Sequence, residues 1–260
     1  MARTATIQPL PFDVRLAQAG ANVLLALLAI ALLAAAVWWL ARLPAFNLRG
    51  ITVEGDLEHN SPLTMRAIVA PRLAGSFLSL DLARARDAFE AVPWVRRATV
   101  RRVWPDRLAV TIEEHRVAAL WNADGDDEAL VNSYGEVFEA NLGDVEDEPL
   151  PRLAGPAGSA ARVLAMHHTL APVLAPLGSP LDTLRLTGHG AWRARLANGV
   201  VIELGRGEPE AVAARTARFV RTLPQVSASY QRPLLAADLR HADGYAVRLK
   251  GVTTTGATRH

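Results

Sequence analysis

The feature that most constrains this chain is a long apolar run near its N-terminus. From Val23 to Ala41 there is no charged or strongly polar side chain. At about 1.5 Å per residue, a helix over this run spans roughly 28 Å, close to the thickness of the hydrocarbon core of a bilayer. Trp38 and Trp39 fall where an interfacial aromatic belt would lie. We therefore predict a membrane anchor over residues 23–43, represented by Val23, Leu32, Trp38, Trp39 and Ala41.

Two other interpretations of the run are a buried core helix and a cleaved signal peptide. A core helix would show a polar stripe, and this run has none. Ala34-Ala35-Ala36 resembles a cleavage site, but the apolar run continues beyond it, which favours an uncleaved anchor. Arginines lie on both sides of the run, so charge gives only a slight bias in orientation. No second run of spanning length follows, so we expect one crossing, with residues 1–22 in the cytoplasm and the remainder outside it.

Composition excludes several classes of function. The chain has no cysteine, which removes disulfides, thiolate zinc sites and cysteine nucleophiles together. Its formal net charge is only +2, so long-range attraction to nucleic acid is not a property of the whole chain. Hydrophobic residues make up 50% of the sequence, which is enough to build a folded core.

The residues that follow the anchor show the order strand, helix, helix, strand, strand. Ser61-Pro62 and Asp81 are helix-start signals, and Pro105 with Asp106 favours a tight turn between the last two strands. We expect two helices to cover one face of a three-stranded sheet, with tryptophans packed beneath them. The expected strands are Leu48–Gly55, Arg97–Val103 and Leu108–Glu113, and the expected helices are Ser61–Ala70 and one that runs from Asp81 to just before Pro93.

The second module, residues 117–250, has short strands and more turns. Asn198-Gly199 between two alternating runs is the strongest hairpin signal in the chain. Helices are expected at Ser159–Leu170, re-forming beyond Pro172, and at Pro209–Leu223. The expected strands are Val117–Trp121, Ala129–Val131, Leu181–Leu186, Trp192–Leu196, Val200–Leu204, Leu234–Leu239 and Tyr245–Lys250. The fold class is therefore α+β, with a mixed β-sheet flanked by helices and a disordered tail over residues 251–260.

Several short sequence words occur in this chain in a fixed order. They are Leu48–Gly55, Phe77–Asp81, Val92–Val95, Val100–Leu108, Leu150–Pro156, Leu204–Gly207 and Asp238–Arg240. With these words the chain resembles the FtsQ/DivIB family of bacterial cell-division proteins, from about residue 20 to residue 250. Asn132, where an Asp is usual, and His241, where an aromatic is frequent, depart from the family pattern.

The resemblance implies a fold and a cellular role. Residues 46–116 are expected to form a POTRA domain with the order β-α-α-β-β, and residues 117–250 a C-terminal β domain. The implied protein is a single-pass type II protein of the cell inner membrane, with a cytoplasmic N-terminus and periplasmic domains at the division septum. It is expected to link early and late division proteins in the divisome, with control of divisome assembly and septal wall synthesis as a further role. A POTRA-containing component of outer-membrane protein assembly or secretion is the alternative.

The last predicted strand is the expected working surface. No strand follows Tyr245–Lys250, so this segment is expected at a sheet edge. Arg248 and Lys250 are explained either as charges that blunt the edge or as part of a surface to which a partner adds a strand. The resemblance favours the second and implies that FtsB, and through it FtsL, binds here. The implied contact residues are Arg240, His241, Asp243, Gly244, Tyr245, Ala246, Val247, Arg248, Leu249 and Lys250.

Other kinds of site are weaker hypotheses. The basic and aromatic cluster Trp94, Arg96, Arg97, Arg101, Arg102, Trp104 and Arg107 could face nucleic acid, but anionic lipid or an acidic partner fits an extracytoplasmic domain better. Glu113-Glu114-His115 offers a base and carboxylates, but neighbours on a strand point to opposite faces. His167-His168 lacks a third metal ligand. We therefore expect no catalysis, no metal or cofactor and no small-molecule substrate, with further division proteins binding through the POTRA domain and membrane lipid contacting the anchor.

Overall fold

The structure is a computed structural model that describes residues 12–40, 48–55, 57–73, 77–123, 128–230, 232–241 and 244–251. Two compact units make up the chain. The first comprises Met1–Val92 and Arg97–Glu113, and the second comprises Pro93–Arg96 and Glu114–His260.

The N-terminal helix α1 spans Phe12–Leu40 and contains the apolar run. Within it, Gly20–Trp39 is long and apolar enough to cross a membrane, judged by length and composition, and is the one such helix in the described part of the chain. The helix begins well before Val23 because polar residues can extend a helix beyond its apolar part. Val23, Leu32, Trp38 and Trp39 are all exposed on α1, whereas Ala41 lies outside the described residues.

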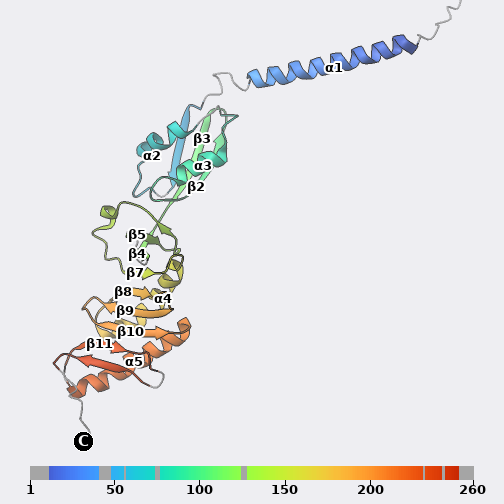
Figure 1. The fold of residues 1–260 in the computed structure, drawn as a ribbon. Coiled ribbons are helices and arrows are strands. Elements are labelled where there is room, and N and C mark those ends of the chain that lie inside the picture. The colour runs from blue at the N-terminus through green and yellow to red at the C-terminus, as the bar shows by residue number, and fades with distance from the viewer. Residues whose placement is uncertain are drawn as a thin grey trace, which may run out of the picture. The chain divides into compact units, whose positions relative to one another are not determined.

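The first unit contains the three-stranded sheet that the sequence predicts. The strands are β1 (Gly50–Gly55), β2 (Val95–Val103) and β3 (Arg107–Glu114), in the order β1-β3-β2. The parallel pair β1 and β3 begins with Gly50 opposite Arg107. The helices are α2 (Pro62–Val69), extended by the 3₁₀ turn η2 (Ala70–Arg72), and α3 (Leu82–Glu90). The predicted order of strands and helices is confirmed (Figure 1).

Capping residues define both helix starts in this unit. The hydroxyl of Ser61 accepts a hydrogen bond from the amide of Thr64 at 3.1 Å, with Pro62 in the first helical turn. The carboxylate of Asp81 accepts the amide of Ala83 at 2.9 Å. The helices then bury an apolar side against the sheet, so that Phe89 of α3 is fully enclosed. The other buried members of the two helices are Met65, Val69 and Ala85.

The tryptophans of the basic and aromatic cluster do not lie where the sequence suggested. Trp104 is 77% exposed at the tip of the turn between β2 and β3, where no helix covers it. Trp94 is buried, but it packs with Phe138 in the second unit. The prediction that both tryptophans pack under the two helices is therefore wrong, because one is at a turn tip and the other precedes the strand. Arg102 is used inside the first unit, where its guanidinium donates to the carbonyl oxygen of Phe77 at 2.8 Å.

A mixed nine-stranded sheet forms the second unit. Its order is β12-β11-β10-β9-β8-β7-β4-β5-β6. The pairs β4–β7, β7–β8 and β10–β11 are parallel, and the remaining pairs are antiparallel. The strands are β4 (Val117–Ala123), β5 (Ala129–Asn132), β6 (Val137–Phe138), β7 (Arg152–Gly155), β8 (Leu181–Leu186), β9 (Ala191–Leu196), β10 (Val201–Arg206), β11 (Leu234–Asp238) and β12 (Ala246–Leu249).

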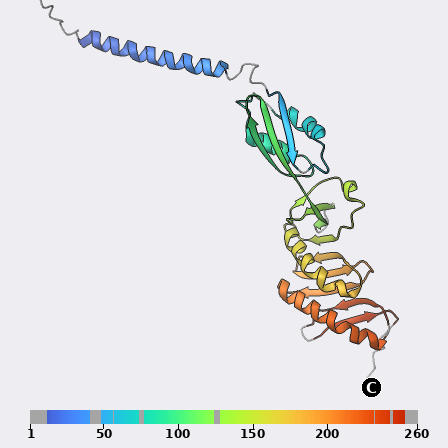
Figure 2. The same cartoon turned by 180° about the vertical axis from the view of Figure 1, so that it is seen from behind.

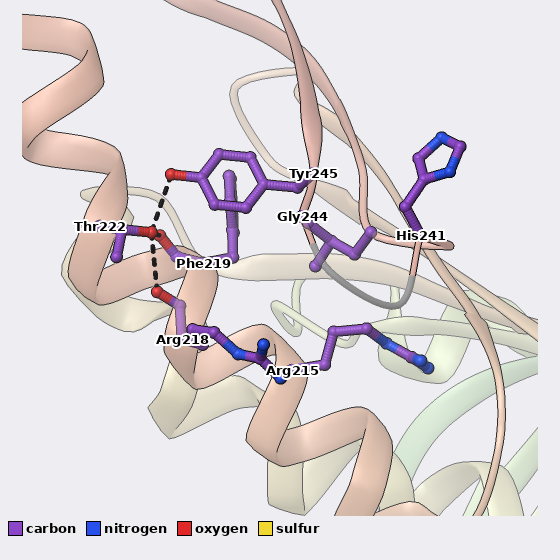
Figure 3. A pocket seen from close by; sticks show the side chains of 8 residues that line it. Arg215, Arg218, Phe219, Thr222, His241, Gly244 and Tyr245 are labelled. Carbon is purple, nitrogen blue, oxygen red and sulfur yellow. Dashed lines mark hydrogen bonds between the residues drawn. The ribbon is translucent and has the colours of Figure 1, made fainter.

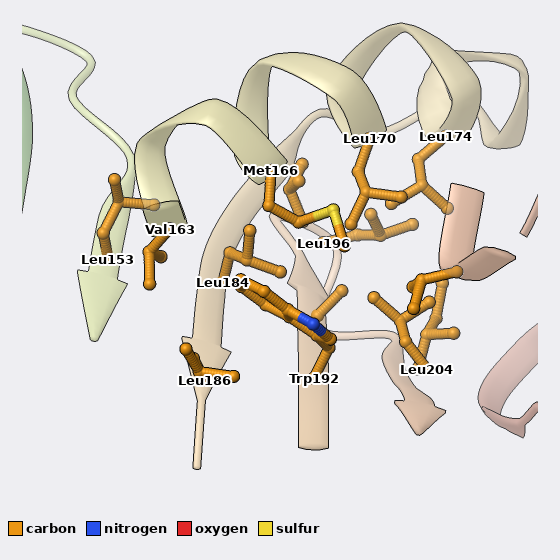
Figure 4. Packing of buried hydrophobic residues seen from close by; sticks show 14 of the residues in the cluster. Leu153, Val163, Met166, Leu170, Leu174, Leu184, Leu186, Trp192, Leu196 and Leu204 are labelled. Carbon is orange, nitrogen blue, oxygen red and sulfur yellow. The ribbon is translucent and has the colours of Figure 1, made fainter. Parts of the chain in front are cut away.

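Helices α4 (Ala160–Leu174) and α5 (Pro209–Tyr230) cover one face of this sheet (Figures 1 and 2). The predicted interruption at Pro172 is wrong, because α4 continues through this proline. Proline removes one backbone hydrogen bond, but Leu170 and Leu174 on either side are both fully buried in the core. Tertiary packing therefore holds the helix together across the proline. Figure 4 shows both leucines pointing from α4 toward the sheet.

The main core lies between these helices and the strands beneath them. Trp192 of β9 is its largest fully buried side chain, and it lies among leucines from β8, β10 and α4 (Figure 4). The hairpin that carries Trp192 turns at Asn198-Gly199, as predicted. Gly199 has a φ of +86°, and the Oδ1 atom of Asn198 accepts the amide of Val200 at 3.1 Å.

The β6 end of the sheet is closed by a smaller core. Its buried members are Trp94, Leu130, Phe138 and Val145. The ring of Trp94 meets that of Phe138 edge-on, with the centroids 5.5 Å apart. The indole Nε1 of Trp94 donates to Asp144 at 3.0 Å, which ties the 3₁₀ turn η3 (Leu142–Val145) over this end. The segment that follows β6 thus covers the end of the sheet with its own side chains.

A polar network lies beside this smaller core. Asn132 is fully buried, and its amide nitrogen donates to the carboxylate of Glu136 at 2.6 Å. Arg96 binds the same carboxylate with two hydrogen bonds, of 2.7 and 3.1 Å. The hydrogen bonds from Arg96 and Asn132 lower the pKa of Glu136. An asparagine suits this position because an aspartate would place a second carboxylate against Glu136 and could not donate to it when ionised.

Candidate functional site

The last strand, β12, is the outermost strand of the nine-stranded sheet within the described residues. It pairs antiparallel with β11, and Ala246 stands opposite Asp238. The strand is shorter than the predicted Tyr245–Lys250, because it comprises Ala246–Leu249 with the two predicted end residues flanking it. An outermost strand has one row of backbone groups that its own sheet does not use. This edge is therefore the first candidate for a binding surface.

Side chains and amides of β12 alternate in direction. Leu249 is buried and Val247 packs against the main core, whereas Ala246 and Arg248 are exposed. The amide of Lys250 donates to the carbonyl oxygen of Pro233 at 3.0 Å. Because successive amides in an antiparallel strand point to opposite sides, we infer that the amides of Val247 and Leu249 point away from β11. The edge thus offers backbone donors with small or basic side chains beside them.

Arg240 follows β11 and is already paired within the chain. Its Nε atom lies 2.9 and 3.0 Å from the two carboxylate oxygens of Asp238, and its Nη2 atom lies 2.5 Å from Oδ2. The hydrogen bonds from Arg240 lower the pKa of Asp238 to about 2, and Asp238 in turn raises the pKa of Arg240. The Arg240 side chain is nevertheless 62% exposed. A partner carboxylate would therefore approach a guanidinium that Asp238 already orients and partly neutralises.

Gly205 of β10 lies directly against Arg240. It has a φ of +80°, and a Cβ atom at this position would come within 3.2 Å of the Arg240 Cγ atom. The amide of Leu239 also donates to the carbonyl oxygen of Glu203 at 2.8 Å, which holds the segment before Arg240 against β10. Glycine is therefore required for both its backbone conformation and its small size. This gives a structural reason for the glycine in the sequence word Leu204–Gly207.

A pocket of about 250 Å³ lies between α5 and the residues that lead into β12 (Figure 3). The ring of Tyr245 meets that of Phe219 edge-on with centroids 5.0 Å apart, and its hydroxyl lies 2.8 Å from that of Thr222. Two arginines of α5 add positive charge to this otherwise apolar hollow. The lining residues are Arg215, Arg218, Phe219, Thr222, Leu239, His241, Gly244 and Tyr245.

The structure brings most of the residues predicted for this site into one region. His241, Gly244 and Tyr245 line the pocket, Arg240 stands at the end of β11, and the strand residues form the edge. Asp243 lies outside the described residues. The α5 side of the pocket was not predicted, because the helix was read only as an apolar stripe facing the sheet. The spacing of Arg215 and Arg218 around Phe219 and Thr222 was the signal that could have found it.

The residues considered for catalysis have structural roles instead. The ring of His115 stacks on Phe138 with centroids 4.0 Å apart and lies within hydrogen-bonding distance of Asn132. Glu114, the residue before His115 in the sequence, is also buried. His167 is half-buried on α4, and burial lowers its pKa. Within the described residues, no group of three or more His, Asp or Glu side chains is arranged to hold a metal ion.

Comparison with known proteins gives a consistent result over both units. Residues 46–115 match the family described as "POTRA domain, FtsQ-type", and residues 119–240 match "Cell division protein FtsQ/DivIB, C-terminal". Similar proteins named "Cell division protein FtsQ" include those of Burkholderia pseudomallei, at 42% identity over 92% of this chain and 94% of the relative, and Thiomonas arsenitoxydans, at 38% over 96% and 92%. The relative of Bordetella pertussis is 39% identical over 91% of this chain and 92% of its own length.

An apolar N-terminal helix, a POTRA domain and a mixed β-sheet define a class of membrane-anchored division proteins. The chain belongs to the FtsQ/DivIB family of cell-division proteins. Membership supports a role in the divisome, and the apolar helix fits a single-pass protein of the inner membrane. The C-terminal family match ends at residue 240, so all of β12 lies beyond it.

Proposed function

We propose that this chain is a divisome scaffold that binds FtsB, and through it FtsL, along the β12 edge. A segment of the partner adds a strand to β12 by backbone hydrogen bonding, and the side chains next to the edge select it. The observation that carries the proposal is the position of β12 as the outermost strand in the described part of the sheet, with Arg240 and the pocket beside it.

The chemistry of the site defines what the partner segment should contain. Arg240, just after β11, and Arg248, within β12, are exposed cations near the edge, so an acidic residue in the partner gains a charge-assisted hydrogen bond. Arg240 suits this role better than a lysine because its planar guanidinium can contact Asp238 and a second carboxylate together. The pocket between α5 and the residues that lead into β12 accepts an apolar side chain from the same segment. The expected partner is therefore an extended, acidic segment with one apolar anchor.

The scaffold is proposed to work outside the cytoplasm. Residues 1–22 stay in the cytoplasm, the anchor crosses the inner membrane once, and the POTRA domain (46–116) and β domain (117–250) lie in the periplasm at the septum. In this arrangement the protein links early and late division proteins by binding and carries out no reaction. A hydrolytic assay on the purified full-length chain should give no turnover above buffer, and reproducible turnover would contradict a purely scaffolding role.

The test of the edge uses two changes in the full-length chain with FtsB and FtsL co-expressed. Val247→Pro removes an amide that we infer to point outward, and Arg240→Glu reverses the charge next to the edge. Each is expected to weaken capture of FtsB by about 3 kcal/mol, or roughly a hundredfold. Arg221→Glu, on the exposed side of α5 and outside the pocket lining, is the matched charge-reversal control and should bind normally.

The outcome separates the edge from other surfaces. Unfolding measured for each variant checks that the sheet is intact, because Val247 contacts the core. If FtsB is captured normally by both folded variants, the interface lies elsewhere on the chain. If Arg221→Glu weakens capture as strongly as Arg240→Glu does, general charge and not the edge determines binding.

The POTRA domain is proposed to recruit further division proteins. Its sheet and helices form a unit with its own core, which makes an independent docking module reasonable. Replacing residues 46–92 and 97–113 with an unrelated domain of similar size, with Pro93–Arg96 kept for the second unit, should impair septal localisation in cells while FtsB capture persists. Normal localisation of the exchanged protein would remove this role from the POTRA domain.

A further inference from the structure

Trp104 has an unusual position for a large aromatic residue. It stands at the turn between β2 and β3 and is 77% exposed, so the fold gains little from its indole ring. Such an exposed apolar ring requires another explanation than packing. Tryptophan is the residue most favoured at the boundary between a membrane and water, where its ring is buried and its N–H stays hydrated.

The turn that carries Trp104 is tied to the membrane anchor by a short length of chain. The amide of Arg49 donates to the carbonyl oxygen of Asp106 at 2.9 Å, and Gly50 pairs with Arg107. Arg49 is only the ninth residue after Leu40, where α1 ends. Nine extended residues reach at most about 30 Å. The turn is therefore fixed to the end of the POTRA sheet at which the chain arrives from the anchor.

The surroundings of the turn are basic. Arg49, Arg101 and Arg107 are exposed there, with Asp106 as the acidic residue of the turn. Asp106 lies 3.8 Å from Arg49 and offsets one of these charges, so the three arginines still leave a net positive charge at this end. Exposed arginines next to a membrane anchor are attracted to anionic phospholipid headgroups.

An open groove of about 470 Å³ lies at the same end of the sheet, beside β1. Its lining combines apolar side chains, Leu48 and Leu73, with the guanidinium of Arg49. Arg66 also lines it, and its guanidinium donates to the carbonyl oxygen of Ile51. Apolar walls with cations at the rim suit the boundary between headgroup and acyl chain better than they suit bulk water.

We propose that this end of the POTRA domain rests on the membrane surface, with Trp104 inserted at the interface and Arg49, Arg101 and Arg107 contacting anionic phospholipid. The contact depends on the anchor and on this patch, and it is independent of the proposed FtsB edge. It gives the domain a preferred orientation on the bilayer.

The experiment measures tryptophan fluorescence of the full-length chain in nanodiscs that contain lipids brominated near the headgroup. Bromine quenches only nearby indoles, so the difference between the wild type and Trp104→Phe isolates Trp104 from the other five tryptophans. We expect Trp104 to be quenched by at least half in discs that contain phosphatidylglycerol and less in phosphatidylcholine discs. Because Trp104 is exposed, its replacement should leave the fold intact, which circular dichroism checks.

A matched control moves the indole to the other end of the same unit. Leu63 is 76% exposed at the start of α2, whereas Ala70, at the end of that helix, lines the groove next to Gly50. In the double variant Trp104→Phe with Leu63→Trp, the new indole should not be quenched. If Trp104 in the wild type is quenched no more than this control, the proposal is wrong. If Trp104 is shielded only after FtsB and FtsL are added, it contacts protein and the lipid proposal is equally overturned.

Discussion

The two ends of the nine-stranded sheet differ in how far the side chains of neighbouring segments cover them. At one end, β6 is only two residues long, and its Phe138 is buried with Trp94 and Val145, while Val137 is exposed. At the other end, β12 is the outermost described strand and carries exposed Ala246 and Arg248. Both ends contain an arginine paired with a carboxylate, but the arginine side chain is largely buried only at the β6 end.

The two arginine–carboxylate pairs therefore differ in role: the Arg96 pair stabilises the fold, and the Arg240 pair lies on the surface that is proposed to bind a partner. The Arg96 side chain is only 13% exposed, and its partner Glu136, although 49% exposed, also binds the fully buried Asn132, so the pair is anchored to the interior. The Arg240 side chain is 62% exposed and its carboxylate partner is two residues away in sequence. Substitutions at the closed end should therefore change the free energy of unfolding, whereas substitutions at the β12 end should change partner binding.

The largest expected effect is that of Phe138→Ala at the closed end. It removes a ring that contacts both Trp94 and His115, so the free energy of unfolding should fall by about 3 kcal/mol. Urea unfolding of the full-length chain in detergent measures this change, and FtsB capture by the folded fraction should be unaltered. A loss below about 1 kcal/mol would mean that the β6 end is not held by its aromatic core.

A smaller loss is expected for Asn132→Asp. The change replaces a donor to Glu136 with a second carboxylate in a fully buried position, which should cost about 2 kcal/mol at neutral pH. The cost should decrease as the pH falls, because protonating one carboxylate restores a donor. Unfolding at pH 7 and pH 5 measures both effects. A variant as stable as the wild type at pH 7 would contradict the explanation given for the asparagine.

The smallest expected effect concerns Asp238→Asn at the β12 end. The pKa of Asp238 is lowered from 3.8 to about 2, so its contribution to stability is present above about pH 4 and is lost as the pH falls toward 2. The variant should therefore lose slightly less stability than the wild type between pH 4 and pH 2. Acid unfolding followed by circular dichroism tests this, and identical acid profiles would show that the surface pair adds nothing to folding.

Local signals in the sequence were sufficient for much of the fold. The Asn198-Gly199 hairpin and the caps at Ser61 and Asp81 depend on residues that are neighbours in the chain, and all are found as predicted. The prediction of a helix break at Pro172 is wrong because tertiary burial of the flanking leucines outweighs the local helix-breaking effect of proline. The strand order, in which β7 lies between β4 and β8, depends on long-range parallel pairing that no local pattern specifies.

The candidate site was predictable only in part. The edge strand and Arg240 were named from the resemblance and the terminal alternating run, but the pairing of Arg240 with Asp238 was not. Asp238 and Arg240 are opposite charges two positions apart in sequence, where β11 ends, and this spacing was a usable signal. The pocket was missed because Phe219 and Tyr245 come from elements that only the folded chain brings together.

The shortness of β12 has a mechanical consequence. Four residues pair with β11, so few hydrogen bonds resist a force on this strand. A pull along the strand axis loads all of these bonds at once, whereas a pull away from the sheet breaks them one after another, starting at one end. A bound partner that is pulled parallel to β12 would therefore stay bound far longer than one that is pulled away from the sheet, even if both form the same contacts without load.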